Sequence, residues 1–158
     1  MTKQDTQACD LRIARQLDAP LDMIWRAWSE PELLSQWWCP KPWRTEVHAF
    51  EFRPGGDFHT VMHGPEGEVH PNPGCFLEIL PKQRVVFTTM LTGGWRPAAP
   101  PFIATTGIFT MRPEGQGVFY EAMALHADSA SATRHAELGF EEGWGIVIDQ
   151  LQALARNL

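Results

Sequence analysis

The chain has 158 residues, a formal net charge of −6, 44% hydrophobic residues and 20% charged residues. This length predicts a single domain over residues 1–158, large enough to bury a hydrophobic core. The acidic balance argues against nucleic acid or an anionic membrane as a partner, because both attract basic surfaces.

The first ten residues lack the apolar core of a signal peptide, and no apolar run is long enough to span a membrane. We therefore expect a cytoplasmic protein with no membrane insertion. The cysteines Cys9, Cys39 and Cys75 are odd in number and far apart, so they support neither a disulfide framework nor a cysteine-rich metal site.

Strands and two short helices are expected in the first 125 residues. Alternating apolar residues predict a strand at residues 10–17. Pro20 opens the first helix, and Ser29 with Glu32 forms a capping-box pattern for the second. Six further strands, separated by turn residues, are predicted at 44–51, 57–63, 74–80, 84–91, 102–111 and 118–125. The short connections favour antiparallel pairing.

The last predicted element is one continuous amphipathic helix from Ser129 to Leu158, with Ser129 as its N-cap. The residues of its apolar face recur at the helical period: Phe140, Trp144, Val147, Ile148, Leu151, Leu154, Ala155 and Leu158. Gly139 and Gly143 each cost about 1 kcal/mol relative to alanine inside a helix. They indicate either fraying at this end or open space beside the helix.

This order of elements predicts an α+β fold in which a curved, seven-stranded antiparallel sheet wraps around the C-terminal helix. The two short helices close one end. Because sheet and helix diverge towards Gly139, we expect a pocket there. The Gly- and Pro-rich break at residues 92–101, which contains Trp95, predicts either a lid or a disordered hairpin tip.

Several motifs, in this order along the chain, resemble those of a known family. They are Pro20 to Trp28, Pro31-Glu32-Leu33-Leu34, Gln36-Trp37-Trp38, Arg53-Pro54-Gly55-Gly56, Gly74 with Leu77-Glu78-Ile79, Leu125-His126-Ala127-Asp128, His135, and Gly139 to Trp144. The chain resembles a bacterial START-like family of the SRPBCC superfamily, polyketide-cyclase-like and related to the C-terminal domain of activators of the heat-shock-protein-90 ATPase. The resemblance implies the helix-grip fold and a cavity for an apolar ligand, but no particular reaction.

Aromatic residues are the predicted lining of the pocket, with a few polar anchors. The ligand-binding candidates are Trp38, Phe58, Phe76, Trp95, Phe102, Tyr120, Glu137, Phe140 and Trp144, of which Glu137 and Tyr120 are the anchors. For at least half of them, ordinary core packing is the alternative. The predicted function is binding of a small hydrophobic molecule, without a metal or other cofactor.

A cyclase- or hydrolase-type enzyme is the first alternative. His126, at the end of the last strand, and Glu137, on the final helix, are its candidate acid–base pair. A hydrogen bond from His126 to a loop carbonyl is the competing interpretation. His59 and His63 do not form a metal pair, because residues four apart on a strand are separated by about 13 Å.

A co-chaperone-like or other protein-interaction module is the second alternative. The strands at 84–91 and 102–111 are apolar on both faces, with Val85 and Phe87 on one face and Val86 and Met90 on the other. An apolar outer face predicts a possible homodimer.

Overall fold

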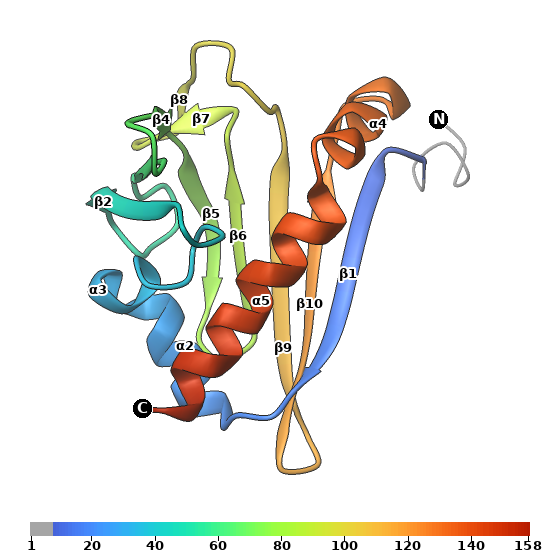
Figure 1. Cartoon of the computed structure of the whole chain (residues 1–158). Coiled ribbons are helices and arrows are strands. Elements are labelled where there is room, and N and C mark those ends of the chain that lie inside the picture. Colours follow the sequence, from blue (N-terminus) through green and yellow to red (C-terminus); the bar gives the residue numbers. More distant parts are fainter. Residues whose placement is uncertain (1–7) are drawn as a thin grey trace.

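The computed structural model describes residues 8–158 (Figure 1). In chain order its elements are β1 (Asp10–Leu17), α2 (Leu21–Ser29), α3 (Pro31–Leu34), β2 (Arg44–Phe50), β3 (Phe58–His63), β4 (Val69–Asn72), β5 (Cys75–Leu80), β6 (Arg84–Thr88), β7 (Leu91–Thr92), β8 (Arg96–Pro97), β9 (Thr106–Glu114), β10 (Gly117–Leu125), α4 (Ser129–Glu137) and α5 (Phe140–Arg156). The fold is α+β, as expected, and α5 runs diagonally across one face of the largest sheet.

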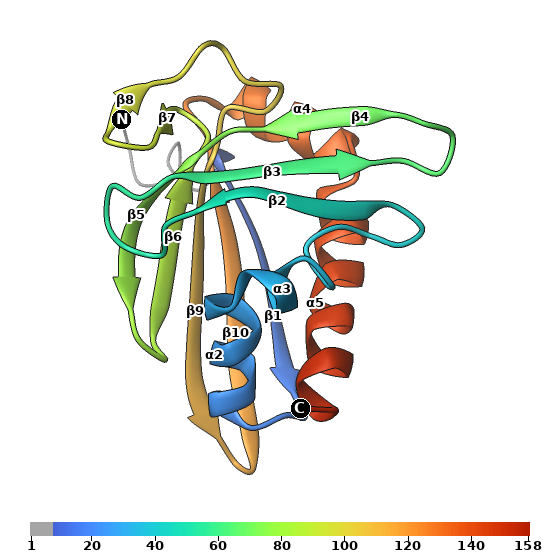
Figure 2. The same cartoon turned by 90° about the vertical axis from the view of Figure 1, so that its left-hand side faces the viewer.

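The strands form three antiparallel sheets. The largest has the order β1-β10-β9-β6-β5, the second β2-β3-β4, and the third only β7-β8. A bridge between Asp57 and Cys75 and a backbone hydrogen bond from Phe58 to Gly74 link the first two sheets. Figure 2 shows β2, β3 and β4 running across the ends of the longer strands. The strands therefore curve around α5.

The count of strands differs from the predicted seven, since residues 8–158 contain ten strands in three sheets. The predicted strands correspond to β1, β2, β3, β5, β6, β9 and β10. The additional strands β4, β7 and β8 have four, two and two residues, and β4 and β8 each contain a proline. Segments this short show no alternation long enough to be recognised from sequence.

The C-terminal helix is not continuous, which corrects the prediction. α4 ends at Glu137 and α5 begins at Phe140, and Gly139 between them has a φ of +98°. A left-handed residue cannot continue a right-handed helix, and glycine adopts this conformation at little steric cost. Gly139 therefore marks a change of direction between two helices.

The N-cap of α4 is Asp128, and Ser129 is the first helical residue. The carboxylate of Asp128 accepts a hydrogen bond of 2.7 Å from the backbone N–H of Ser131. This bond lowers the pKa of Asp128. Asp128 thus satisfies one of the free amides in the first turn of α4.

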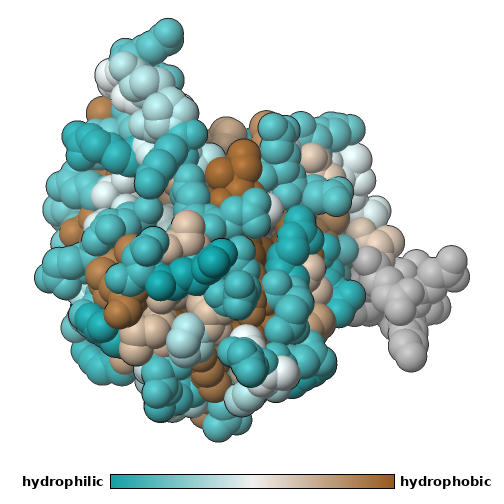
Figure 3. All heavy atoms as spheres, turned by 60° about the horizontal axis from the view of Figure 1, so that its bottom comes forward, coloured by the Kyte–Doolittle hydropathy of each residue, from teal (hydrophilic) through white to brown (hydrophobic). Residues whose placement is uncertain are grey.

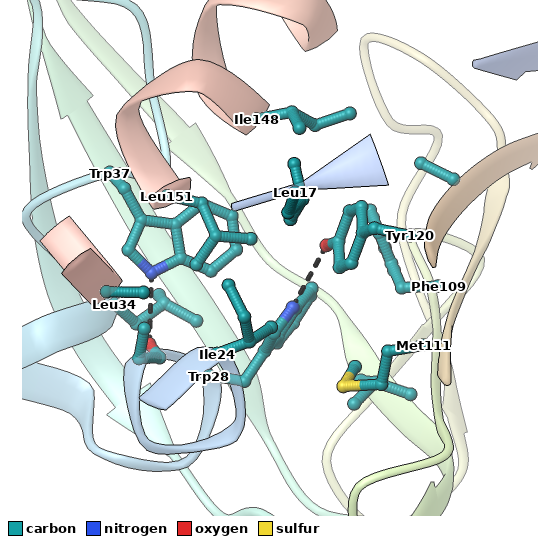
Figure 4. Close-up of a cluster of buried hydrophobic side chains, with 14 of the residues drawn as sticks. Leu17, Ile24, Trp28, Leu34, Trp37, Phe109, Met111, Tyr120, Ile148 and Leu151 are labelled. Atoms are coloured by element: carbon teal, nitrogen blue, oxygen red, sulfur yellow. Dashed lines mark hydrogen bonds between the residues drawn. The ribbon is translucent and has the colours of Figure 1, made fainter. Parts of the chain in front are cut away.

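The main core lies where α2 and the C-terminal half of α5 meet the sheet (Figure 4). Ile24 and Trp28 of α2 and Leu151 of α5 are completely buried. Burying a side chain of this size contributes roughly 2–3 kcal/mol. This packing closes one end of the molecule and leaves the Gly139 end of α5 as the place where helix and sheet separate.

The outer face of the largest sheet carries a row of half-buried apolar side chains. Val85 and Phe87 point into the core, whereas Val86 is half-buried in a row with Ile108 and Met123 on the neighbouring strands. Met90 follows β6 and is exposed. Ion pairs at both edges, Arg12–Glu121 and Arg84–Glu78, flank this row of apolar side chains.

Figure 3 shows another face of the molecule, on which apolar residues form small areas separated by polar ones. None of the helices between residues 8 and 158 is long and apolar enough to cross a membrane. The homodimer stays a prediction.

Candidate ligand-binding cavity

A cavity of about 700 Å³ lies at the Gly139 end of α5, between this helix and the sheets. One wall consists of residues of the α4–α5 junction, namely His135, Leu138, Gly139, Phe140, Gly143 and Trp144. The opposite wall comes from β3 and β4 (Thr60, Met62, His70, Asn72) and from residues 98–103. Sites for small molecules usually measure about 300–1,000 Å³, so this cavity has the size of a ligand site.

Aromatic rings form the inner end of the cavity. Trp38 packs edge-on against Phe58, with 5.2 Å between the ring centroids, and Trp144 stacks on Phe109 at 5.5 Å. These four residues contact the core and also line the cavity. The cavity surface here is therefore made of rings that the core already holds in place.

Six of the predicted ligand-binding residues line this cavity: Trp38, Phe58, Phe102, Tyr120, Phe140 and Trp144. Three do not. Phe76 is fully buried and stacks on Phe58 at 4.4 Å, on the core side of that ring. Trp95 is 52% exposed and lies over Gly55, where an added Cβ would come within 2.5 Å of the indole nitrogen.

Glu137 is the third predicted ligand-binding residue that lies outside the cavity. It is exposed on α4 and is not part of the cavity lining. Its inward position was predicted by extending the periodicity of α5 through residue 139. The break at Gly139 gives α4 its own orientation, so this extrapolation fails.

The break at residues 92–101 contributes to the cavity through Thr92 and residues 98–101. The adjoining Phe102 is 54% exposed, and its ring packs between His70 and Arg134, each 5.0 Å from its centre. Arg134 also donates a hydrogen bond of 2.9 Å to the Phe102 carbonyl. α4 is therefore tied directly to this loop beside the cavity.

His126 and His135 form a hydrogen-bonded pair at the α4 side of the cavity. His126 Nδ1 lies 2.8 Å from the carbonyl oxygen of Cys9, and His126 Nε2 lies 2.8 Å from His135 Nδ1. His135 is buried and lines the cavity. Burial and, second, the charge of His126 lower the pKa of His135 to about 4. The sequence alone did not single out His135 as a site residue.

The predicted acid–base pair is not assembled. His126 makes the hydrogen bond to a loop carbonyl that the competing interpretation proposed, and in the described part of the chain no hydrogen bond or ion pair joins it to Glu137. The side chain of Glu137 is exposed and is not part of the cavity lining.

The other histidines lie elsewhere. His63 Nε2 is 2.8 Å from Glu46 Oε1, and the ring of His59 packs on that of His48 with 4.8 Å between centroids. Across residues 8–158, no three side chains of His, Cys, Asp or Glu are grouped so that they could hold a metal ion.

Residues 18–156 match the family described as "Activator of Hsp90 ATPase homolog 1-like protein", and the chain belongs to this family. The match confirms the START-like resemblance. No curated protein matches the chain.

Solved structures agree with this assignment. The crystal structure of protein NE0264 from Nitrosomonas europaea is 40% identical, with a TM-score of 0.90 over 95% of this chain and 96% of that one. The AHSA1 protein from Silicibacter pomeroyi is 24% identical, with a TM-score of 0.68 over 91% and 95% of the two chains. A protein from Arthrobacter aurescens is 23% identical, with a TM-score of 0.83 over 98% and 90%. The last two similarities show the fold alone.

Proposed function

We propose that the protein binds a small hydrophobic or aromatic molecule in the cavity between the sheets and α5. The observation that carries this proposal is the combination of a volume of about 700 Å³ with a lining of aromatic rings. Apolar clefts with a few polar groups are the usual form of small-molecule sites. The START-like family to which the chain belongs is consistent with such a role.

The lining also supports the proposal through its rigidity. Trp38 is in ring contact with Trp28, Phe58 and Phe87, and Trp144 is in ring contact with Phe109, Phe140 and His135. Rings held this way lose little conformational freedom when a ligand binds, and this limits one of the main costs of binding.

The position of Gly143 allows a direct test by filling the cavity. Gly143 lines the cavity, and a Cβ built on it meets no described heavy atom within 4 Å. Gly143→Phe therefore places a ring into the open space without displacing the core. The matched control is Ile146→Phe, three residues further along α5, where the side chain is partly exposed.

The experiment has two parts. Native mass spectrometry of freshly purified protein looks for a co-purified small molecule, and a panel of aromatic and aliphatic probes is titrated against tryptophan fluorescence and melting temperature. We expect binding to wild type and Ile146→Phe, with a stabilisation that follows mass action, and at least about tenfold weaker binding to Gly143→Phe. Equal binding to all three proteins would place the ligand outside this cavity. A panel that changes neither signal would remove the main support for the proposal.

A further inference from the structure

The direction of the hydrogen bonds through His126 and His135 follows from the chemistry of their partners. A carbonyl oxygen can only accept, so His126 Nδ1 donates to Cys9 O at 2.8 Å. When both imidazoles are neutral, each has one N–H group, so His126 Nε2 is an acceptor and receives the hydrogen of His135 Nδ1, also at 2.8 Å. Nε2 of a neutral His135 therefore has a free lone pair and no hydrogen.

This Nε2 atom is available to the cavity. His135 lines the cavity, and its ring packs edge-on against Phe140 at 5.3 Å and Trp144 at 6.0 Å. Within residues 8–158, the one buried side-chain nitrogen or oxygen without a hydrogen-bond partner is Nε2 of His59. His135 Nε2 makes no hydrogen bond within this part of the chain and is not one of the fully buried atoms, so it keeps accessible surface on a side chain that lines the cavity.

The ring of His135 is also held neutral. Burial is the main cause that lowers its pKa to about 4, and protonation of His126 acts in the same direction. Near pH 7 the cavity wall therefore carries an uncharged hydrogen-bond acceptor between two aromatic rings. Such an acceptor pairs with a hydroxyl or N–H group, whereas a carboxylate would bring an anion against a lone pair in an apolar site.

We propose that His135 Nε2 accepts a hydrogen bond from the ligand and thereby selects hydrophobic or aromatic molecules that carry a hydroxyl or N–H group. This inference rests on the proposed function and specifies its ligand class. His126 is a positioning residue, because it touches no ligand and acts by fixing the tautomer of His135. The cavity thus discriminates between a phenol or alcohol and its methyl ether.

The binding test uses three probes with one ring system: 2-naphthol, 2-methoxynaphthalene and 2-naphthoate. At pH 7.5 in wild type, we expect 2-naphthol to bind about tenfold or more tightly than either of the others, because they leave the acceptor unpaired. In His135→Phe the preference for 2-naphthol over 2-methoxynaphthalene should fall to about one, while binding of the ether persists.

Two variants of His126 test the positioning role. His126→Ala frees His135 to exchange its N–H between the two nitrogens, so the preference for 2-naphthol should decrease. His126→Gln supplies an amide that can donate to Cys9 O and accept from His135, so it should restore the preference. Nitrogen-15 NMR of the histidine rings gives an independent measurement, with the hydrogen of both neutral rings expected on Nδ1.

The outcomes separate this inference from the function on which it rests. If 2-naphthol and its ether bind equally well, the selection is wrong and the cavity proposal stands. If none of the probes binds, both proposals lose their support. A hydrogen found on His135 Nε2 in wild type would overturn the inference directly. Should His135→Phe not fold, the comparison of His126→Ala with His126→Gln decides the same question.

Discussion

Trp28 donates its indole N–H to the hydroxyl of Tyr120 at 3.0 Å, and neither side chain has exposed surface (Figure 4). The two residues come from α2 and β10, 92 positions apart. Burial raises the pKa of Tyr120, so the phenol keeps its proton and the bond persists at alkaline pH. This bond fixes the orientation of α2 on the sheet beside the cavity.

Replacing Tyr120 with Phe should destabilise the protein by about 1–3 kcal/mol, because the buried indole N–H of Trp28 is left without a partner. Urea unfolding followed by circular dichroism measures the change. In a double-mutant cycle with Trp28→Phe, the combined loss should be smaller than the sum of the single losses. Additive losses would show that the two side chains are not coupled.

The glycines at 139 and 143 should respond oppositely to alanine. Gly139→Ala places a side chain at a φ of +98° and should cost about 1–2 kcal/mol. Gly143→Ala lies inside α5 beside open space and should stabilise the protein by up to about 1 kcal/mol. Thermal unfolding of the two variants provides the comparison. The same sign for both would contradict the break between α4 and α5.

His135 should make stability depend on pH. Its folded pKa of about 4 lies below the ordinary value of 6.5, so between these values the unfolded chain binds more protons than the folded protein. Stability therefore rises with pH in this window, and it falls by up to about 1.4 kcal/mol per pH unit on acidification, or about 3 kcal/mol in total.

The measurement is urea unfolding at several pH values between 6.5 and 4.5. His135→Phe provides the control, because the same slope should be much flatter without this ring. The pKa of the Asp128 carboxylate is also lowered, so the stability that it contributes is lost as the pH falls through that lowered pKa. This contribution is expected in both wild type and His135→Phe. Parallel curves would show that His135 is not the responsible group.

Gln150 of α5 forms hydrogen bonds with the segment at residues 37–41, which follows α3. Its amide nitrogen donates to the carbonyls of Trp37 (3.2 Å) and Cys39 (2.9 Å), and its oxygen accepts from the N–H of Lys41 (3.0 Å). Gln150→Ala should cost about 2–3 kcal/mol, because each lost bond is worth about 1 kcal/mol. Gln152→Ala is the matched control, since Gln152 accepts one hydrogen bond, from Asp18 N. If Gln150→Ala lowers the free energy of unfolding no more than Gln152→Ala does, Gln150 does not stabilise this segment as proposed.

Much of the fold was predictable because the spacing of apolar residues along the sequence indicates which side chains are buried. The apolar face of α5 includes Phe140, Ile148 and Leu151, which are buried as their spacing indicates. The break at Gly139 was not predictable in the same way, since a sequence does not reveal the sign of φ at a glycine. Ser129 was predicted as the N-cap of the C-terminal helix, whereas Asp128 beside it, whose side chain offers the same chemistry, takes this role.

The cavity lining was harder to predict than the cavity itself. Phe58 and Phe76 stack on one another, yet only Phe58 faces the open space, and this choice depends on how two sheets meet. Trp95 was placed in the lining because it lies within a loop that does contribute to it. His135 was missed because its inward orientation depends on how α4 is rotated relative to α5 across the break at Gly139.

The cavity opens to solvent, and this has an energetic consequence of its own. Water reaches its largely apolar walls whenever no guest occupies the space. Expelling that water from aromatic walls should give guest binding a negative change in heat capacity.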